Sequence, residues 1–173
     1  MSAVYSLLLA LLPVTAVSLA HAAPGELKTI VMLNFELIDD TGDTASEDAQ
    51  HRRLAMISEQ LRHEFAERGL YRVLDNTPAA ETIGRYRADQ PLYNCNGCER
   101  DIAAKLNADR VLTGWVQKVS NLILNINIEI KNVATGETVL KKSVDIRGNT
   151  DQSWSRGVSY MVRDMVEKGQ GGR

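Results

Sequence analysis

The chain has 173 residues, a formal net charge of −2 at pH 7 and 44% hydrophobic residues. Because the charge is nearly balanced and no basic run occurs, nucleic acid and anionic membranes are excluded as main partners. The composition is ordinary for a globular protein, and this length is enough for one domain with a substantial core.

The N-terminus has the features of a cleaved signal peptide. An uncharged apolar run over residues 7–20 ends in an A-x-A cleavage pattern, so we predict a signal peptide over residues 1–22. The run is too short to span a bilayer comfortably, and no later run is long enough. We therefore expect a periplasmic protein without membrane insertion after cleavage. A single α/β domain should cover residues 23–166, and the polar, glycine-rich residues 167–173 should form a flexible tail.

Spacing of apolar residues predicts the elements of the first half of the domain. Residues 27–37 are rich in β-branched and apolar side chains, which is typical of a strand buried on both faces. Residues 71–75 predict a second, short strand, and residues 76–87 and 98–108 predict two helices. Between the two strands, four apolar residues recur at the spacing of a helix that ends near Gly69: Leu54, Ile57, Leu61 and Phe65.

The second half predicts three antiparallel strands within residues 109–146 and a final helix. A two-residue turn at Ser120-Asn121 would pair Trp115 with Ile126 and place both in the core. Apolar and polar residues alternate from 122 to 131, which indicates one buried and one exposed face. Gly136 suits the positive φ of the next turn. An apolar stripe marks the last helix: Trp154, Val158, Met161 and Met165.

The predicted order of elements is β-α-β-α-α-β-β-β-α. It indicates an α/β (α+β) domain with a mixed sheet of about five strands and helices mainly on one face, ending in a three-stranded antiparallel meander and a final helix. The uncovered sheet face is a candidate interaction face, and an exposed edge strand would also suit a homodimer. The candidate residues of this face are Asn125, Asn127, Glu129, Arg147 and Asn149.

The two cysteines, Cys95 and Cys98, form a C-x-x-C pair. Glu99 stands where a c-type haem site requires His, and a structural zinc site requires four ligands, which the two remaining histidines of the mature chain do not supply nearby. In an oxidising compartment two cysteines this close are most often joined, so we predict a structural disulfide. Their place at the start of a helix keeps a redox role open, and a metal role is a further alternative.

An acidic segment follows the first strand. Five carboxylates occur within ten residues, and Asp39, Asp40 and Asp43 are candidate ligands for a hard cation such as calcium or a lanthanide. The spacing does not fit an EF-hand loop. The simpler interpretation is a solvated loop whose acidic residues favour the positive end of the next helix. We expect no resident metal or other cofactor.

Motifs of enzymes are missing from the sequence. It contains no G-x-S-x-G, no H-E-x-x-H, no phosphate-binding glycine loop and no dinucleotide-binding fingerprint. No spacing of Ser, His and Asp suggests a catalytic triad. We therefore predict that the protein is not an enzyme.

Two stretches, MLNFELIDD (32–40) and CNGCERDIAAKLNADRVLTGWV (95–116), resemble an exported proteobacterial family catalogued as a domain of unknown function. More loosely, the chain is similar to the N-terminal domain of TolB and to CsgG/LpoB-like envelope proteins. Asn107 departs from that pattern, which usually has Gly there. The residues that carry the looser likeness are Leu33, Asn34, Phe35, Ala108, Asp109, Thr113, Gly114, Thr135, Gly136 and Glu137.

This resemblance implies an envelope domain that works by contact with other proteins, and it brings no catalytic residues. The family is also loosely associated with gene clusters for periplasmic alcohol oxidation by quinoprotein dehydrogenases. The resulting hypothesis is a non-enzymatic periplasmic accessory module that binds a periplasmic or envelope protein. The alternatives are a periplasmic carrier of a small ligand or of calcium or a lanthanide, and a thiol–disulfide redox protein.

Overall fold

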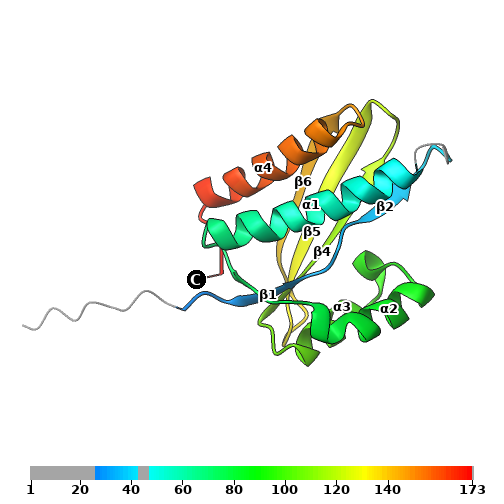
Figure 1. Cartoon of the computed structure of the whole chain (residues 1–173). Coiled ribbons are helices and arrows are strands. Elements are labelled where there is room, and N and C mark those ends of the chain that lie inside the picture. The colour runs from blue at the N-terminus through cyan, green and yellow to red at the C-terminus, as the bar shows by residue number, and fades with distance from the viewer. Residues whose placement is uncertain (1–25, 43–46, 173) are drawn as a thin grey trace, which may run out of the picture.

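A computed structural model describes residues 26–42 and 47–172, and its elements follow the predicted order (Figure 1). The predicted signal peptide lies outside these residues. The helices are α1 (Glu47–Glu67), α2 (Ala80–Asp89), α3 (Cys98–Lys105) and α4 (Asp151–Glu167), with 3-10 turns η2 (Thr77–Ala79) and η3 (Leu92–Asn94). The strands are β1 (Thr29–Met32), β2 (Glu36–Asp39), β3 (Arg72–Val73), β4 (Arg110–Lys118), β5 (Ile123–Asn132) and β6 (Thr138–Arg147).

The strands form one mixed sheet in the order β3-β1-β4-β5-β6, and β2 pairs with β4 beyond the end of β1. Strands β1 and β2 run parallel to β4, whereas β4, β5 and β6 form the predicted antiparallel meander. The α/β fold class is therefore confirmed. The sheet has one strand more than expected, because the predicted first strand is interrupted at residues 33–35.

The interruption places Phe35 over a glycine of the central strand. A Cβ added to Gly114 would lie 2.6 Å from the Phe35 ring, so only glycine leaves room for the ring there. The backbone N–H of Phe35 donates to Ser58 Oγ at 2.9 Å instead of to a neighbouring strand. Packing of one aromatic ring therefore divides the predicted strand into β1 and β2.

Helices α1 and α4 lie side by side over one face of the sheet and enclose the larger part of the core (Figure 1). The predicted helical stripes are confirmed: all eight of their apolar side chains are buried. Helix α4 begins at a capping box, in which the Thr150 side chain accepts from the backbone N–H of Ser153 and the Ser153 side chain accepts from that of Thr150.

Helices α2 and α3 lie against the opposite face, at one end of the sheet (Figure 1). They close a second apolar cluster with Val31 and Leu33 of the first predicted strand and Val111 of β4. Because Ile30 and Met32 belong to the first cluster, β1 is buried on both faces, as predicted. Within the described residues, no helix is both long enough and apolar enough to span a membrane.

The turn between β4 and β5 is one residue longer than predicted. The backbone N–H groups of Val119 and Ser120 both donate to the carbonyl of Ile123 at 3.1 Å. Ser120 Oγ accepts from the backbone N–H of Leu122 at 3.2 Å and of Ile123 at 3.1 Å. A serine side chain thus closes a loop that the sequence pattern assigned to a two-residue turn.

The longer turn shifts the pairing of β4 with β5 by one residue. Val116, and not Trp115, lies opposite Ile126, and Trp115 lies opposite Asn127. Successive side chains of a strand point to opposite faces, so this shift moves Trp115 to the face away from the core. The prediction that Trp115 shares the core face with Ile126 was wrong.

The C-terminal residues return to the start of the domain. The backbone N–H of Lys28 donates to the carbonyl of Gly172 at 2.6 Å, and the N–H of Gly172 donates to the carbonyl of Leu70 at 2.7 Å. Gly172 is buried. These bonds hold the segment predicted as a flexible tail against the residues next to β1 and β3.

Candidate functional site

The sheet face opposite α1 and α4 exposes a polar surface over β4, β5 and β6. Cross-strand pairing aligns its members in rows, with Trp115 opposite Asn127 and Asn127 opposite Ser143. The next row pairs Asn125 with Asp145. We call this surface the outer sheet face, and it comprises Trp115, Asn125, Asn127, Ser143, Asp145 and Arg147.

An aromatic pair borders the outer sheet face. The rings of Tyr93 and Trp115 are stacked, with centroids 5.4 Å apart and an interplanar angle of 27°, and both residues are half-buried. The backbone N–H of Tyr93 donates to Glu36 Oε2 at 3.1 Å, which fixes η3 beside the neighbouring strand β2. Sequence reasoning missed Trp115 as a surface residue, and the signal that could have found it is Ser120, whose hydroxyl favours a longer turn.

The predicted interaction residues fall into two groups. Asn125 and Asn127 are half-buried and Arg147 is exposed, and all three lie on the outer sheet face. Glu129 shares the face but is only 9% exposed, and its Oε1 accepts from Thr138 Oγ1 at 2.6 Å. Its carboxylate therefore stabilises the β5–β6 pair more than it offers a contact to a partner.

Asn149 does not join the others. Its Oδ1 accepts from Trp154 Nε1 at 3.0 Å and from Arg53 Nη1 at 3.2 Å, on the side of the sheet that α1 and α4 cover. Trp154 is a fully buried core residue. The Asn149 side chain thus satisfies the buried indole N–H, and the structure places it away from the outer sheet face.

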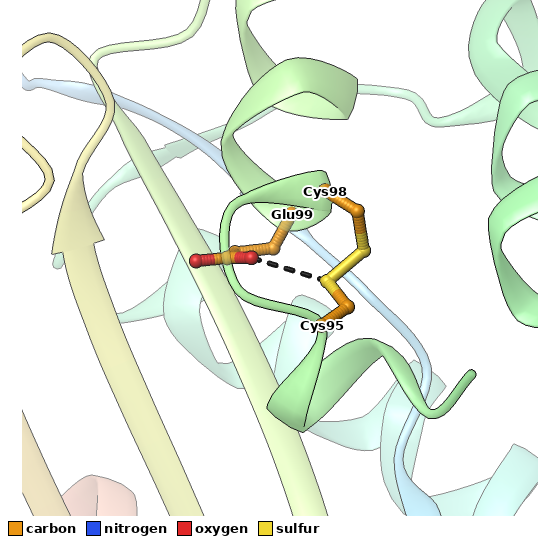
Figure 2. A group of neighbouring side chains, drawn as sticks. All are labelled: Cys95, Cys98 and Glu99. Atoms are coloured by element: carbon orange, nitrogen blue, oxygen red, sulfur yellow. Dashed lines mark hydrogen bonds between the residues drawn. A yellow bond between two sulfur atoms is a disulfide. The ribbon is translucent and has the colours of Figure 1, made fainter.

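The predicted disulfide between Cys95 and Cys98 is present, at the start of α3. The two cysteines are 5% and 4% exposed. Glu99 is 2% exposed, and its Oε2 lies 3.2 Å from Cys95 Sγ (Figure 2). The same oxygen accepts from the backbone N–H of Gly97 at 3.0 Å. Glu99 Oε1 forms an ion pair with Lys131 Nζ at 2.9 Å.

This arrangement ties the helix start to the sheet. The donor atoms of Cys95, Cys98 and Glu99 lie within 4.8 Å of one another, which would suit a soft metal ion only if the cysteines were reduced. As found, the two sulfurs are bonded to each other, and Glu99 already has Lys131 of β5 as its counter-ion. Burial of both sulfurs also limits the access that thiol–disulfide exchange requires.

Two of the predicted cation ligands, Asp39 and Asp40, contact side chains of β4. Asp39 Oδ2 lies 2.9 Å from Nζ of the fully buried Lys118, and Asp40 Oδ2 accepts from Gln117 Nε2 at 3.1 Å. Burial alone would raise the pKa of Asp39, but hydrogen bonds from Thr41 and Lys118 outweigh it and lower that pKa to about 2. Asp43 lies outside the described residues. A cation at Asp39 would therefore have to displace an internal ammonium group.

Several solved structures are similar to this chain. The C-terminal domain of LpoB from Escherichia coli is 14% identical, with 74% of this chain and 88% of that chain covered and a TM-score of 0.49. Lipoprotein GNA1162 from Neisseria meningitidis is 16% identical, with 83% and 96% covered and a TM-score of 0.49. TolB from Acinetobacter baumannii is 12% identical, with 85% of this chain but 30% of TolB covered and a TM-score of 0.43.

No curated protein sequence matches the chain significantly. The model of one protein family, DUF3280, described as "Protein of unknown function (DUF2380)", matches residues 28–166. This match spans all the strands and nearly all of α4, and it confirms the resemblance to a domain-of-unknown-function family. The chain therefore belongs to the DUF3280 family.

Proposed function

We propose that this protein is a non-enzymatic accessory module of the bacterial periplasm that binds another periplasmic or envelope protein through its outer sheet face. The observation that carries the proposal is the position of Trp115. Its ring is half-buried, stacked on Tyr93 of η3 and set beside the amides of Asn127 and Asn125, on the sheet face opposite α1 and α4.

Such a combination suits recognition of a protein surface. Tryptophan, tyrosine and arginine are enriched among the residues that dominate binding energy at protein interfaces. Trp115 is held in place by its stack with Tyr93, so little conformational entropy is lost when a partner covers it. Asn125 and Asn127 supply donors and acceptors that can adapt to a partner's backbone, and Arg147 adds a charged group at the margin.

The biological process is a separate proposal. The family association with periplasmic alcohol oxidation makes a quinoprotein dehydrogenase the first partner to test. The experiment is a pull-down from periplasmic extract with the chain tagged ahead of residue 26, followed by mass spectrometry. A captured dehydrogenase would support the process, and a reproducible partner of another kind would replace it while leaving the interaction role in place.

Two matched variants test whether capture uses the outer sheet face. Asn127→Arg puts a long charged side chain beside Trp115, and Ala55→Arg puts the same side chain at an exposed position of α1 on the other side of the domain. We expect Asn127→Arg to abolish capture and Ala55→Arg to retain it, with similar melting temperatures. If both variants capture the partner as the unmodified chain does, the outer sheet face is not the binding site.

A further inference from the structure

Strand β6 is the free edge of the sheet formed by the described residues. It is the last strand in the order, with β5 as its neighbour on one side. From Val139 to Arg147 its residues alternate between exposed side chains on the outer sheet face and more buried side chains toward α4. An edge strand of this length carries unpaired backbone N–H and C=O groups, which pair readily with another strand.

A groove follows this edge between β6 and α4. Its volume is about 610 Å³, and its lining includes Val144, Ile146, Arg156 and Tyr160. Tyr160 is 51% exposed, although its neighbour Met161 is fully buried. A strand added beside β6 would place its inward-facing side chains in this groove and cover the tyrosine ring.

Charge along β6 selects how a second copy would pair with it. A two-fold axis perpendicular to the sheet places the same face of both copies on the same side. Because directly opposite residues then point to the same face, an antiparallel pair of β6 strands must be centred on one residue and not between two. Centres at Lys141 or Lys142 place two identical lysines opposite each other. A centre at Val144 places Lys141 opposite Arg147. Centres nearer either end leave about half of the strand unpaired.

The centre at Ser143 avoids these like-charge contacts. It places Lys141 of each copy opposite Asp145 of the other, so two ion pairs form symmetrically, in addition to the contact of Lys141 Nζ with Glu129 Oε1 at 3.6 Å within each copy. On the other face it places Leu140 opposite Ile146, and both of these side chains pack on the main core cluster. Lys142 lies opposite the uncharged Val144 in this register, and its ammonium group keeps its ion pair with Asp164.

We propose that β6 pairs with β6 of a second copy of this chain, antiparallel and centred on Ser143, to form a two-fold symmetric dimer with one continuous sheet. The inference does not rest on the proposed function, because it uses the strand edge and not the aromatic pair at Trp115. Dimerisation would join the outer sheet faces of the two copies and present two copies of the Trp115 surface to a partner.

Cysteine cross-linking tests the register. The only two cysteines of the chain are joined, so Ser143→Cys introduces a single free thiol. Directly opposite Cα atoms in an antiparallel pair lie about 4.5–5.5 Å apart, within the roughly 4.4–6.8 Å that a disulfide spans. Ser143→Cys should therefore give a covalent dimer on mild oxidation. Val139→Cys is the matched control, because its equivalents would lie about 26 Å apart along the strands. Equal cross-linking of the two variants would overturn the register.

Charge reversal tests the interface itself. Asp145→Lys and Lys141→Asp each place like charges opposite each other twice, and each should weaken the dimer by roughly tenfold or more. The double variant with both changes restores opposite charges and should restore the dimer. Sedimentation of the unmodified chain and the three variants measures these outcomes. A monomeric unmodified chain at millimolar concentration, or a double variant as weak as the single ones, would refute the proposal.

Discussion

The ion pair between Asp39 and Lys118 allows a quantitative test of the structure. Lys118 is fully buried, and the Asp39 side chain is 18% exposed at the end of β2. The second carboxylate oxygen, Oδ1, accepts from Thr41 Oγ1 at 2.6 Å and from the Thr41 backbone N–H at 2.9 Å. These contacts favour the ionised carboxylate, and they are lost when the chain unfolds.

The pKa of Asp39 sets the expected magnitude. Its folded-state pKa is lowered from the ordinary value of 3.8 to about 2. Since one pKa unit corresponds to about 1.4 kcal/mol, this difference sets an upper limit of about 2.5 kcal/mol, and solvent screening at the partly exposed carboxylate reduces the contribution to the free energy of unfolding to about 2 kcal/mol. For a lowered pKa the contribution is fully present above the unfolded-state value, and it is lost as the pH falls from about 4 toward 2. Asp39→Asn should therefore cost about 2 kcal/mol at pH 7 and little near pH 2.

Urea unfolding at several pH values measures this effect, with the fluorescence of Trp115 and Trp154 as the signal. Asp40→Asn is the control, because Asp40 is exposed and its carboxylate accepts from the side chain of Gln117. The control should change the free energy of unfolding by less than about 0.5 kcal/mol. If Asp39→Asn cost the same at pH 3 as at pH 7, or nothing at pH 7, the charge of Asp39 would not stabilise the fold as described.

Two further experiments test the packing of α4 and the disulfide. Gly157→Ala should lower the melting temperature despite the better helix propensity of alanine, because the added Cβ would lie 2.6 Å from Ile146 Cγ2. Gly84→Ala is the control and should not lower the melting temperature, because the space around its added Cβ is open. Equal melting temperatures of the two variants would contradict this packing. The buried Cys95–Cys98 disulfide should resist dithiothreitol in native buffer and be reduced in urea; rapid reduction in native buffer would favour the thiol–disulfide role instead.

Local patterns predicted the elements and much of the topology. The helical stripes of α1 and α4, the alternation along β5 and the meander each appear as predicted. Turn chemistry was also readable at single positions, since Gly136 adopts φ +77°. Asn107, which stands where the resembled envelope proteins usually have Gly, adopts φ +52°, a conformation that asparagine tolerates.

The candidate site depended on contacts between distant residues. Asn125, Asn127 and Glu129 lie on one face of β5 as predicted, because period-two alternation needs only neighbouring residues. The sequence pattern placed Trp115 on the wrong face, because a single hydroxyl at Ser120 lengthens the turn and reverses every side chain of β4 relative to β5.

By itself, the sequence determined the fold class, the buried stripes and the pairing of two nearby cysteines, since each follows from spacing along the chain. The tertiary structure decided the rest. It brought Phe35 against Gly114 and so divided the first strand. It also paired Asp39, a predicted cation ligand, with the ammonium group of Lys118. Such contacts depend on register and on packing between elements, which no local pattern specifies.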